Sequence, residues 1–486
     1  MPLIAWMPVV AMFLFPAPDD KKNPWTAKVA DAVEKAERTG SVEAYEAALD
    51  ATCRADDWQA GLRLARAACE KFPDARQLRG VIARAFWRAG YVRDAEQMIA
   101  GVAIDSDDRA ALGVRVVSDL ARGRNESALR AARRLAARKD AGATDLSFVV
   151  AARLATGKYD GLGDLLRRTQ RLVDPQNGYP EIYIGEELDG LADFFDHVGS
   201  EPLNQIASHG QARMTAMPLV NLPGCMVTIN GQGPYRMVVD TGGSIMLSID
   251  TEVAEDIGLE SVAPASVHGV SGKEEAGQAV VDELRIGGIV LKRVMTRIFG
   301  VRKATAFTAD GIIGTGLFGQ GRMTLDFENE RLVVSRSSGK PAAGTEIEVR
   351  IVADAKLVAT ITVQGEPVAA LFDSGADVLA LAPSRLKRLF PDKPFRTIDA
   401  AVALGVGGEA GPKISIGPGV DLTIAGRTYT NTSGLGLDVL DNLLGPLLGI
   451  QTDVLVGMPI FRDTKSCTVD YPQCRMWLDW LNNESQ

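Results

Sequence analysis

Two short stretches of this sequence share one arrangement of residues: "MVVDTGGSIMLSI" at Met237–Ile249 and "ALFDSGADVLAL" at Ala370–Leu381. In each, an apolar run ends in an aspartate, a hydroxyl residue and a glycine, and a second apolar run follows. A single short motif of this kind arises easily by chance. Its return at position 373, after its first occurrence at position 240, indicates an internal duplication that supplies two aspartates.

Four landmarks occur in the same order in both halves of this region. A proline, Pro234 or Pro367, lies shortly before each aspartate, at the same interval in both halves. A glycine-rich stretch flanked by strand-like residues follows, "HGVSGKEEAG" or "LGVGGEAG", and is typical of a hairpin tip. An apolar run then ends in glycine, "DGIIGTGLF" or "DVLVGMPIF", before "TLDFENERL" or "TVDYPQCRM". The duplication therefore predicts two similar β-rich halves that contribute one aspartate each.

Asp240 and Asp373 can do chemistry as a pair that neither can do alone. Two carboxylates a hydrogen bond apart cannot comfortably both ionise, so they share one proton and titrate as a unit. The ionised carboxylate can take a proton from a water held between them while the protonated one donates to a carbonyl. Glycine follows because the backbone must turn tightly and offer its N–H to the carboxylate. This chemistry requires no metal and no cofactor.

Length and composition set broad limits on the other function classes. A chain of 486 residues is expected to form two or three domains. The formal net charge of −9 argues against nucleic acid as the main partner. His197, His209 and His268 lie far apart, and the five cysteines lack metal-ligand spacing, so we expect no metal site. Cys53 with Cys69, and Cys467 with Cys474, can form disulfides or remain buried thiols, and the sequence leaves both open.

Positions 1–20 form an apolar segment that becomes polar after Phe15. The segment is too short to span a bilayer as a helix. It is similar to the hydrophobic part of a signal peptide, although it lacks a basic start and Ala17 is followed by Pro18. We therefore expect export to the periplasm or the medium, with a retained anchor giving weak membrane association, or a mis-set start, as alternatives.

Residues 24–200 have a helical pattern with landmarks at a near-constant period. Asp56, Gly90, Gly123 and Gly157 follow one another at almost equal intervals, and the length of the interval is typical of paired antiparallel helices. The stretches "ADDWQAG", "RAGYVRDA", "ARGRNESA" and "ATGKYDGLG" resemble the turns of tetratricopeptide repeats, although most other signature positions are unfilled. The resemblance implies a helical-repeat domain that holds a protein partner on a concave surface or serves only as a scaffold.

After about residue 212 the pattern changes to short β-rich runs separated by glycine and proline. This region divides at "SRSSGKPAAG", residues 335–344, whose small and polar residues suit a linker. We predict a first lobe at 212–335 and a second at 345–486. The expected fold class is a multidomain chain with an all-α helical-repeat N-terminal domain and an all-β bilobed domain.

The β region resembles the retropepsin-like and pepsin-like aspartic proteases over about residues 212–481. The shared pattern is an apolar strand that enters Asp-Thr/Ser-Gly, with a later apolar-apolar-glycine segment. The chain resembles the fused two-lobe form, although each half keeps its own glycine-rich tip, as retroviral members do. The resemblance implies an acid-protease fold, catalytic roles for Asp240 and Asp373, and hydroxyls of Thr241 and Ser374 that bond across the lobe junction.

Further site residues follow from the same resemblance. Gly242 and Gly375 would support the catalytic loops, and Gly314 and Gly457 would pack behind them. The glycine-rich tips would act as flaps. The flap candidates are Gly269, Val270, Ser271, Gly272, Gly405, Val406, Gly407 and Gly408.

Two departures from the family pattern change the expectations. The stretch "SVAPASVHGVSGKEEAG" lacks the flap tyrosine of pepsin. Gly243 and Ala376 stand where strongly acid-active members have a hydroxyl that stabilises the carboxylate. We therefore expect activity toward weakly acidic or near-neutral pH.

The sequence favours one function and leaves a second open. The favoured function is an aspartic endopeptidase that hydrolyses peptide or protein substrates with a water activated between Asp240 and Asp373. The alternative is a catalytically silent peptide-binding or adaptor protein that uses the helical repeats. A dinucleotide site at "GTGLFG" (314–319) is rejected because "RMTLDF" follows as a strand where that motif requires a helix.

Overall fold

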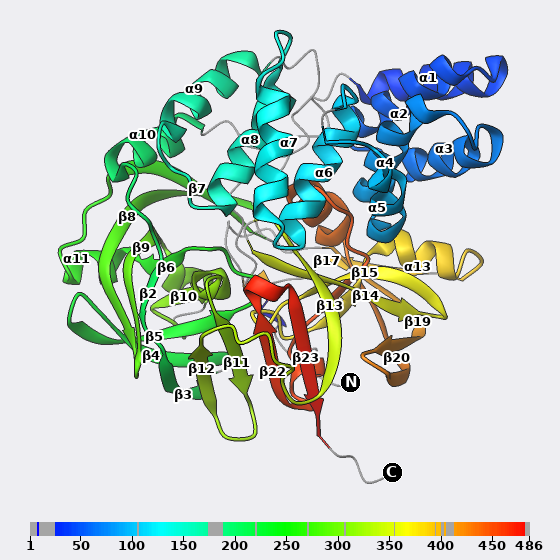
Figure 1. The fold of residues 1–486 in the computed structure, drawn as a ribbon. Coiled ribbons are helices and arrows are strands. Elements are labelled where there is room, and N and C mark those ends of the chain that lie inside the picture. The colour runs from blue at the N-terminus through cyan, green and yellow to red at the C-terminus, as the bar shows by residue number, and fades with distance from the viewer. Residues whose placement is uncertain are drawn as a thin grey trace. The chain divides into compact units, whose positions relative to one another are not determined.

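The structure of the chain is a computed structural model. It describes residues 7–8, 25–104, 106–173, 188–218, 221–269, 272–305, 308–353, 355–393, 395–399, 403–404 and 413–481. The chain forms two compact units. The β unit comprises Met1–Leu14, Ser200–Leu443 and Asp453–Gln486, and the helical unit comprises Phe15–Gly199 and Leu444–Thr452. The predicted fold class, a helical N-terminal region followed by a protease-like β domain, is confirmed (Figure 1).

The helical unit is a succession of short helices in which each packs against the next. The even-numbered helices α2, α4, α6 and α8 also contact one another in turn. The turns after these four helices contain Asp56, Gly90, Gly123 and Gly157, whose φ angles of 59°, 83°, 68° and 67° are all left-handed. Glycine adopts this conformation without a steric penalty, which explains the period seen in the sequence. The helices of this region are α1 (Thr26–Thr39), α2 (Val42–Ala55), α3 (Trp58–Lys71), α4 (Arg79–Arg88), α5 (Val92–Ala100), α6 (Arg109–Ala121), α7 (Asn125–Ala136), α8 (Ala143–Ala155), α9 (Leu162–Leu172) and α10 (Leu188–Val198).

The helical unit also includes a stretch from the predicted second lobe. This stretch, Leu444–Thr452, contains the short helix α14 (Gly445–Leu448). The Gln451 N–H donates to the carbonyl of Arg88 at the end of α4, at 2.8 Å. Ile450 and Thr452 are fully buried.

The first lobe of the β unit is built from short strands. They are β2 (Gln205–Ser208), β3 (Gly210–Ala216), β4 (Pro223–Ile229), β5 (Gln232–Asp240), β6 (Leu247–Asp250), β7 (Ala263–Gly269), β8 (Gly272–Ile286), β9 (Ile289–Phe299), β10 (Gly311–Gly314), β11 (Arg322–Asp326) and β12 (Arg331–Ser335). Two short helices, α11 (Thr251–Asp256) and α12 (Val301–Ala304), lie between strands.

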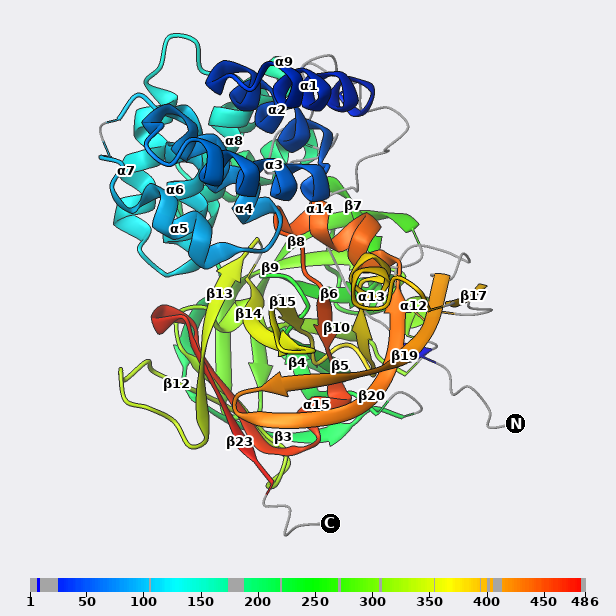
Figure 2. The same cartoon turned by 90° about the vertical axis from the view of Figure 1, so that its right-hand side faces the viewer.

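The second lobe follows the stretch 336–344, which contains no helix or strand. Its strands are β13 (Thr345–Val352), β14 (Lys356–Val363), β15 (Glu366–Phe372), β16 (Leu379–Leu381), β17 (Arg396–Asp399), β18 (Ala403–Leu404), β19 (Lys413–Ile424), β20 (Arg427–Leu437), β21 (Val454–Val456), β22 (Thr464–Asp470) and β23 (Arg475–Trp480). The helices α13 (Pro383–Leu389) and α15 (Met458–Phe461) lie among them, and β19 and β20 form a long hairpin (Figure 2).

The same three-strand arrangement occurs once in each lobe. In the first lobe, β5 pairs in parallel with β10, which pairs antiparallel with β6. In the second, β15 pairs in parallel with β21, which pairs antiparallel with β16. Strands β10 and β21 are buried along their whole length, as expected for strands covered on both faces. The duplication read from the sequence therefore corresponds to equivalent strand pairings.

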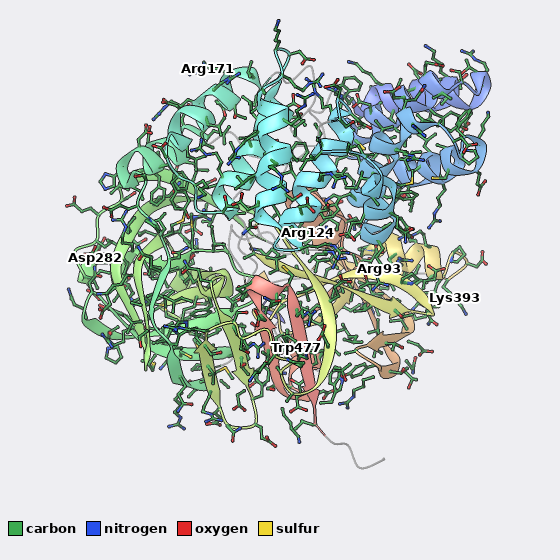
Figure 3. The ribbon with its side chains drawn as sticks, in the orientation of Figure 1. Arg93, Arg124, Arg171, Asp282, Lys393 and Trp477 are labelled. Atoms are coloured by element: carbon green, nitrogen blue, oxygen red, sulfur yellow. The ribbon has the colours of Figure 1, made fainter. Side chains whose placement is uncertain are left out.

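One antiparallel sheet joins the two lobes. Its strand order is β3, β12, β11, β22, β23, β13, with the lobes meeting where β11 pairs with β22. At this junction Arg322 lies opposite Asp470. The Arg322 Nη2 atom lies 2.8 Å from Oδ2 of Asp470, whose side chain is fully buried. The Arg322 guanidinium also lies over the ring of Trp477, 5.2 Å from its centroid. Trp477 belongs to β23 and is labelled in Figure 3.

The described part of the N-terminal segment is a short strand. Strand β1 (Met7–Pro8) pairs in parallel with β18, and the rest of residues 1–24 lies outside the described residues. Across the described ranges, no helix is both long and apolar enough to cross a membrane. All five cysteines are described, and none is in a disulfide, so the structure favours the thiol alternative.

Loss of the Arg322 cation should destabilise the β unit more than loss of a comparable surface cation. In Arg322→Met the buried Asp470 carboxylate loses its partner, which costs about 3–5 kcal/mol of unfolding free energy. The matched control is Arg331→Met, because Arg331 is more exposed and its partner Asp326 also accepts from the N–H of Asn329. The control should cost less than about 1 kcal/mol. Equal losses in thermal unfolding of the two variants would contradict this role for Arg322.

Candidate active site

Two buried strands deliver the aspartates to one place in the β unit. Asp240 is the last residue of β5 and lies in register with Gly314 on β10. Asp373 directly follows β15, and its N–H donates to the carbonyl of Val456 on β21 at 2.9 Å. The side chains of both aspartates are fully buried. The two loops are therefore anchored by equivalent strands on each side.

Each carboxyl is held by the glycine that follows its hydroxyl residue. The Gly242 N–H donates to Oδ1 of Asp240 at 2.7 Å, and the Gly375 N–H donates to Oδ1 of Asp373 at 2.8 Å. A carboxylate that accepts backbone N–H bonds has a fixed orientation. Both glycines thus have the local role that the sequence predicts for them.

The remaining oxygen of each carboxyl is buried. Within the described residues, no donor reaches Oδ2 of Asp240 or Oδ2 of Asp373. The two carboxyls lie within hydrogen-bonding reach of each other. A buried oxygen without a donor is costly, and one proton shared between the carboxyls supplies the missing donor.

The glycines also have a second role that the sequence does not reveal. A Cβ atom on Gly242 would lie 2.3 Å from Cγ of Asp373, and one on Gly375 would lie 2.5 Å from Cγ of Asp240. Each glycine therefore leaves room for the carboxyl of the opposite lobe. Any other residue at these positions would push the two aspartates apart.

The hydroxyls of Thr241 and Ser374 connect the two loops in both directions. Thr241 Oγ1 donates to the carbonyl of Phe372 at 2.9 Å and accepts from the N–H of Ser374 at 2.8 Å. Ser374 Oγ donates to the carbonyl of Val239 at 2.9 Å and accepts from the N–H of Thr241 at 3.0 Å. All of these groups are buried, so each bond fixes one loop against the other.

Gly314 and Gly457 lie where the loops leave no room for a side chain. A Cβ atom on Gly314 would lie 1.9 Å from the carbonyl oxygen of Ser244. One on Gly457 would lie 2.2 Å from the carbonyl oxygen of Val378. Backbone atoms cannot move aside as a flexible side chain can, so both positions require glycine.

The flap candidates are described only in part. Gly269 and Gly272 are paired at the end of the β7–β8 hairpin, as a hairpin tip requires. Val270 and Ser271 lie outside the described residues. The same holds for all four candidates of the second lobe, Gly405, Val406, Gly407 and Gly408.

Burial and proximity determine the ionisation of the pair. Burial, and then the negative charge of Asp373, raise the pKa of Asp240 well above the ordinary aspartate range. Burial also raises the pKa of Asp373, although bonds from Asp240 and from the Gly375 N–H act in the opposite direction. Both carboxyls are therefore harder to ionise than an ordinary aspartate, and the two titrate as a unit.

Two neighbours of the pair carry no recognisable motif and were missed in the sequence. Tyr471 is buried, and its hydroxyl lies 2.6 Å from Oγ1 of Thr315. Burial raises the pKa of Tyr471, so it is a neutral phenol. Lys356 is also buried, and its Nζ donates to the carbonyl of Gly243 at 2.7 Å. The described residues contain no cluster of histidine, cysteine and carboxylate side chains suited to a metal ion.

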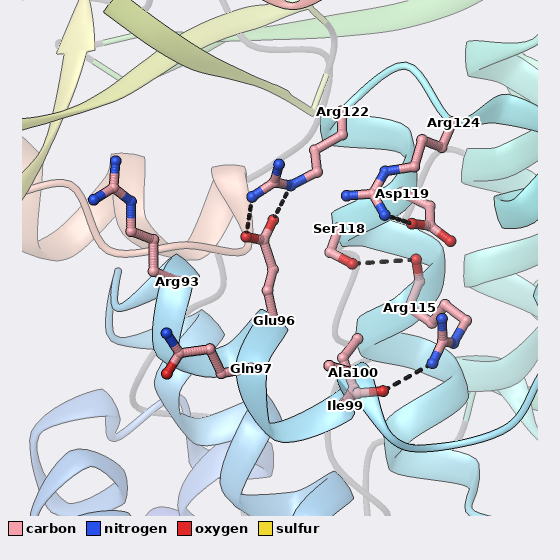
Figure 4. A pocket seen from close by; sticks show the side chains of 10 residues that line it. All are labelled: Arg93, Glu96, Gln97, Ile99, Ala100, Arg115, Ser118, Asp119, Arg122 and Arg124. Carbon is pink, nitrogen blue, oxygen red and sulfur yellow. Dashed lines mark hydrogen bonds and ion pairs between the residues drawn. The ribbon is translucent and has the colours of Figure 1, made fainter.

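The helical unit has a hollow of its own, with a volume of about 530 Å³ (Figure 4). Its charged lining consists of four arginines and two acids: Arg122 binds Glu96 through two nitrogens, and Arg124 lies 3.4 Å from Asp119. Arg115 donates to the carbonyl of Ile99. The lining residues are Arg93, Glu96, Gln97, Ile99, Ala100, Arg115, Ser118, Asp119, Arg122 and Arg124.

Comparison with known proteins gives a match to the β unit. The family model described as "Aspartyl protease" matches residues 225–320, a range that contains Asp240 and Gly314. The β unit is therefore aspartic-protease-like. A solved retropepsin-like aspartic protease from Rickettsia conorii is similar at 19% sequence identity over 28% of this chain and 89% of that chain, with a TM-score of 0.19. No curated protein matches the chain.

The bonds between the two loops should be energetically coupled. Thr241→Val keeps the shape of the side chain but leaves the Phe372 carbonyl and the Ser374 N–H without their partner, at a cost of about 1–3 kcal/mol in unfolding free energy. Ser374→Ala should cost a similar amount, and the double variant should cost less than the sum of the two.

The control for this cycle is Thr423→Val. Thr423 shares a bond with Thr428 on an exposed part of β19 and β20, so its loss should change stability by less than about 0.5 kcal/mol. Strictly additive losses for Thr241→Val and Ser374→Ala would show that the two hydroxyls act independently.

Proposed function

We propose that this protein is an aspartic endopeptidase of the fused two-lobe form. The observation that carries the proposal is the pair of buried carboxyls, one from each lobe, that lie within hydrogen-bonding reach of each other and whose Oδ2 atoms have no donor within the described residues. One proton shared between the carboxyls would supply that donor. A structural aspartate at a turn needs no such partner, because its oxygens are satisfied by its own loop. Two carboxyls brought face to face are instead suited to acid and base chemistry.

In the proposed reaction, the pair divides the two proton transfers of peptide hydrolysis. We assign Asp373 the role of the carboxylate, which takes a proton from a water as that water attacks the scissile carbonyl carbon. Asp240, the acid, donates its proton to the carbonyl oxygen, which gives a neutral tetrahedral diol. The protonated Asp373 then donates its proton to the leaving nitrogen, and Asp240 takes the proton of one diol hydroxyl as the C–N bond breaks. These transfers release the acid and the amine and restore the singly protonated pair. Thr241 and Ser374 act as positioning residues because they hold the loops but do not touch the reacting atoms.

The decisive experiment is cleavage of an unfolded polypeptide by the full chain. Asp240→Asn and Asp373→Asn should each reduce kcat/KM by at least about 1,000-fold, because either change removes one of the two proton-transfer groups. A statine-type inhibitor should abolish cleavage by the wild type. Asp282→Asn is the matched control, since Asp282 is exposed on β8, far along the chain from either loop (Figure 3), and it should leave kcat/KM unchanged.

Absent cleavage, or cleavage that survives either substitution, would overturn the endopeptidase proposal. The second candidate function, a peptide-binding adaptor, would then be favoured by the hollow of the helical unit, where four arginines face two acids. In that case an acidic peptide should bind the protein, and Arg124→Ala should weaken the binding. We also propose that the helical unit is a tetratricopeptide-like repeat domain. We further propose that the protein is exported and associates weakly with a membrane through residues 1–20.

The pH dependence of cleavage should be bell-shaped and displaced toward weakly acidic or near-neutral pH. Activity requires one proton on the pair, so it falls when both carboxyls are protonated at low pH and when both are ionised at high pH. Because burial raises the pKa of both aspartates, both limbs should lie above the ordinary aspartate pKa of about 4. A kcat/KM profile that peaks below about pH 3 would contradict this expectation.

A further inference from the structure

A lysine from the second lobe reaches the catalytic loop of the first. Lys356 is the first residue of β14, and its side chain is fully buried. Its Nζ donates to the carbonyl of Gly243 at 2.7 Å. Gly243 follows directly on Gly242, whose N–H holds the Asp240 carboxyl. The ammonium therefore binds the residue next to the group that orients the proposed acid.

A fully buried ammonium is costly unless negative charge lies close to it. The pair Asp240–Asp373 supplies one such charge, because one carboxyl is ionised when the pair holds a single proton. The Lys356 ammonium lowers the pKa of both carboxyls and so opposes the effect of burial. Tyr471, which interacts electrostatically with Asp240, is neutral and adds no charge beside the pair. Asp354, close to Lys356 in the sequence, lies outside the described residues.

The position of this lysine breaks the symmetry of the duplication. Lys356 precedes Asp373 by the same interval in the sequence as Pro223 precedes Asp240. Both begin a strand that pairs with the strand leading to the aspartate, since β4 pairs with β5 and β14 pairs with β15. The same sequence interval thus leads to a cation in one lobe and to an uncharged residue in the other. The pairing registers differ by one residue, because Leu357 pairs with Phe372 whereas Gly224 pairs with Val238. A position that served only packing would not require a charged side chain.

We propose that Lys356 is a positioning residue whose ammonium balances the single negative charge of the Asp240–Asp373 pair and so sets the pH range in which the pair holds one proton. This inference rests on the proposed function. With one proton on the pair, the charge of the ammonium offsets the charge of the single carboxylate, which lowers the cost of burying both. Without the lysine, the same pair keeps its proton to higher pH and takes up a second proton at higher pH.

The test compares the pH profile of kcat/KM for four variants of the full chain. Lys356→Met and Lys356→Gln remove the charge, and both limbs should move to higher pH by about one unit or more. Lys356→Gln also keeps an N–H donor for the Gly243 carbonyl, so it covers the case in which the methionine variant does not fold. Lys356→Arg keeps the charge, and its limbs should stay within about 0.3 units of the wild type. Lys393→Met, an exposed lysine (Figure 3), is the control and should shift neither limb.

Limbs that stay in place in a folded Lys356→Gln protein, even with a lower rate at every pH, would assign Lys356 a purely structural role and overturn the inference. That outcome would leave the endopeptidase proposal intact. A second readout does not depend on cleavage. The ¹³Cγ resonances of the aspartates are followed by NMR as a function of pH in the wild type and in Lys356→Gln. The variants Asp240→Asn and Asp373→Asn assign the two resonances of the pair. If the wild type cleaves nothing, the proposed function fails. An upward shift of both carboxyl titrations in Lys356→Gln would still support the charge balance. Unshifted titrations would overturn it.

Discussion

The constraint on which the β unit depends is that two carboxyls buried against each other cannot both be ionised. Removing both from water already disfavours their charged forms, and their mutual repulsion adds to that cost. One shared proton relieves the repulsion and satisfies the two Oδ2 atoms that no described donor reaches. The folded state therefore favours a pair that holds one proton and carries one negative charge. The proposed function relies on this constraint, because it would place an acid and a base side by side.

Each lobe completes the site of the other. Gly242 of the first lobe makes room for Asp373, and Gly375 of the second makes room for Asp240. Thr241 and Ser374 each bond to the backbone of the opposite loop. A single lobe therefore lacks the space, the bonds and the partner carboxyl that the site requires. The antiparallel sheet shared by both lobes connects these parts, and the ion pair of Arg322 with the buried Asp470 lies where the lobes meet.

The features predicted from sequence were those that short-range patterns encode. The duplicated motifs located Asp240 and Asp373, because an apolar strand that ends in Asp-hydroxyl-glycine is visible within a single short stretch. The change from helical to strand pattern near residue 212 gave the fold class. Lys356 was missed because a lone lysine at the start of a strand looks like a solvated charge, and its partner Gly243 lies far away in the sequence. The stretch Leu444–Thr452 was missed for the same reason, since nothing local distinguishes an apolar loop that joins the helical unit.

The fused chain permits an asymmetry that two identical chains could not have. If each lobe carried the lysine, two buried ammonium groups would favour two carboxylates, and the pair would lose the proton that makes it an acid. If neither lobe carried it, burial would hold protons on both carboxyls to higher pH, and the base would be lost over that range. A cation from one lobe, with Pro223 at the same sequence interval before the aspartate of the other, suits a pair that needs one charge. In a fused chain, each half can be substituted independently of the other. One lobe can therefore carry a single buried cation, which suits a pair of carboxyls that holds one proton and one negative charge.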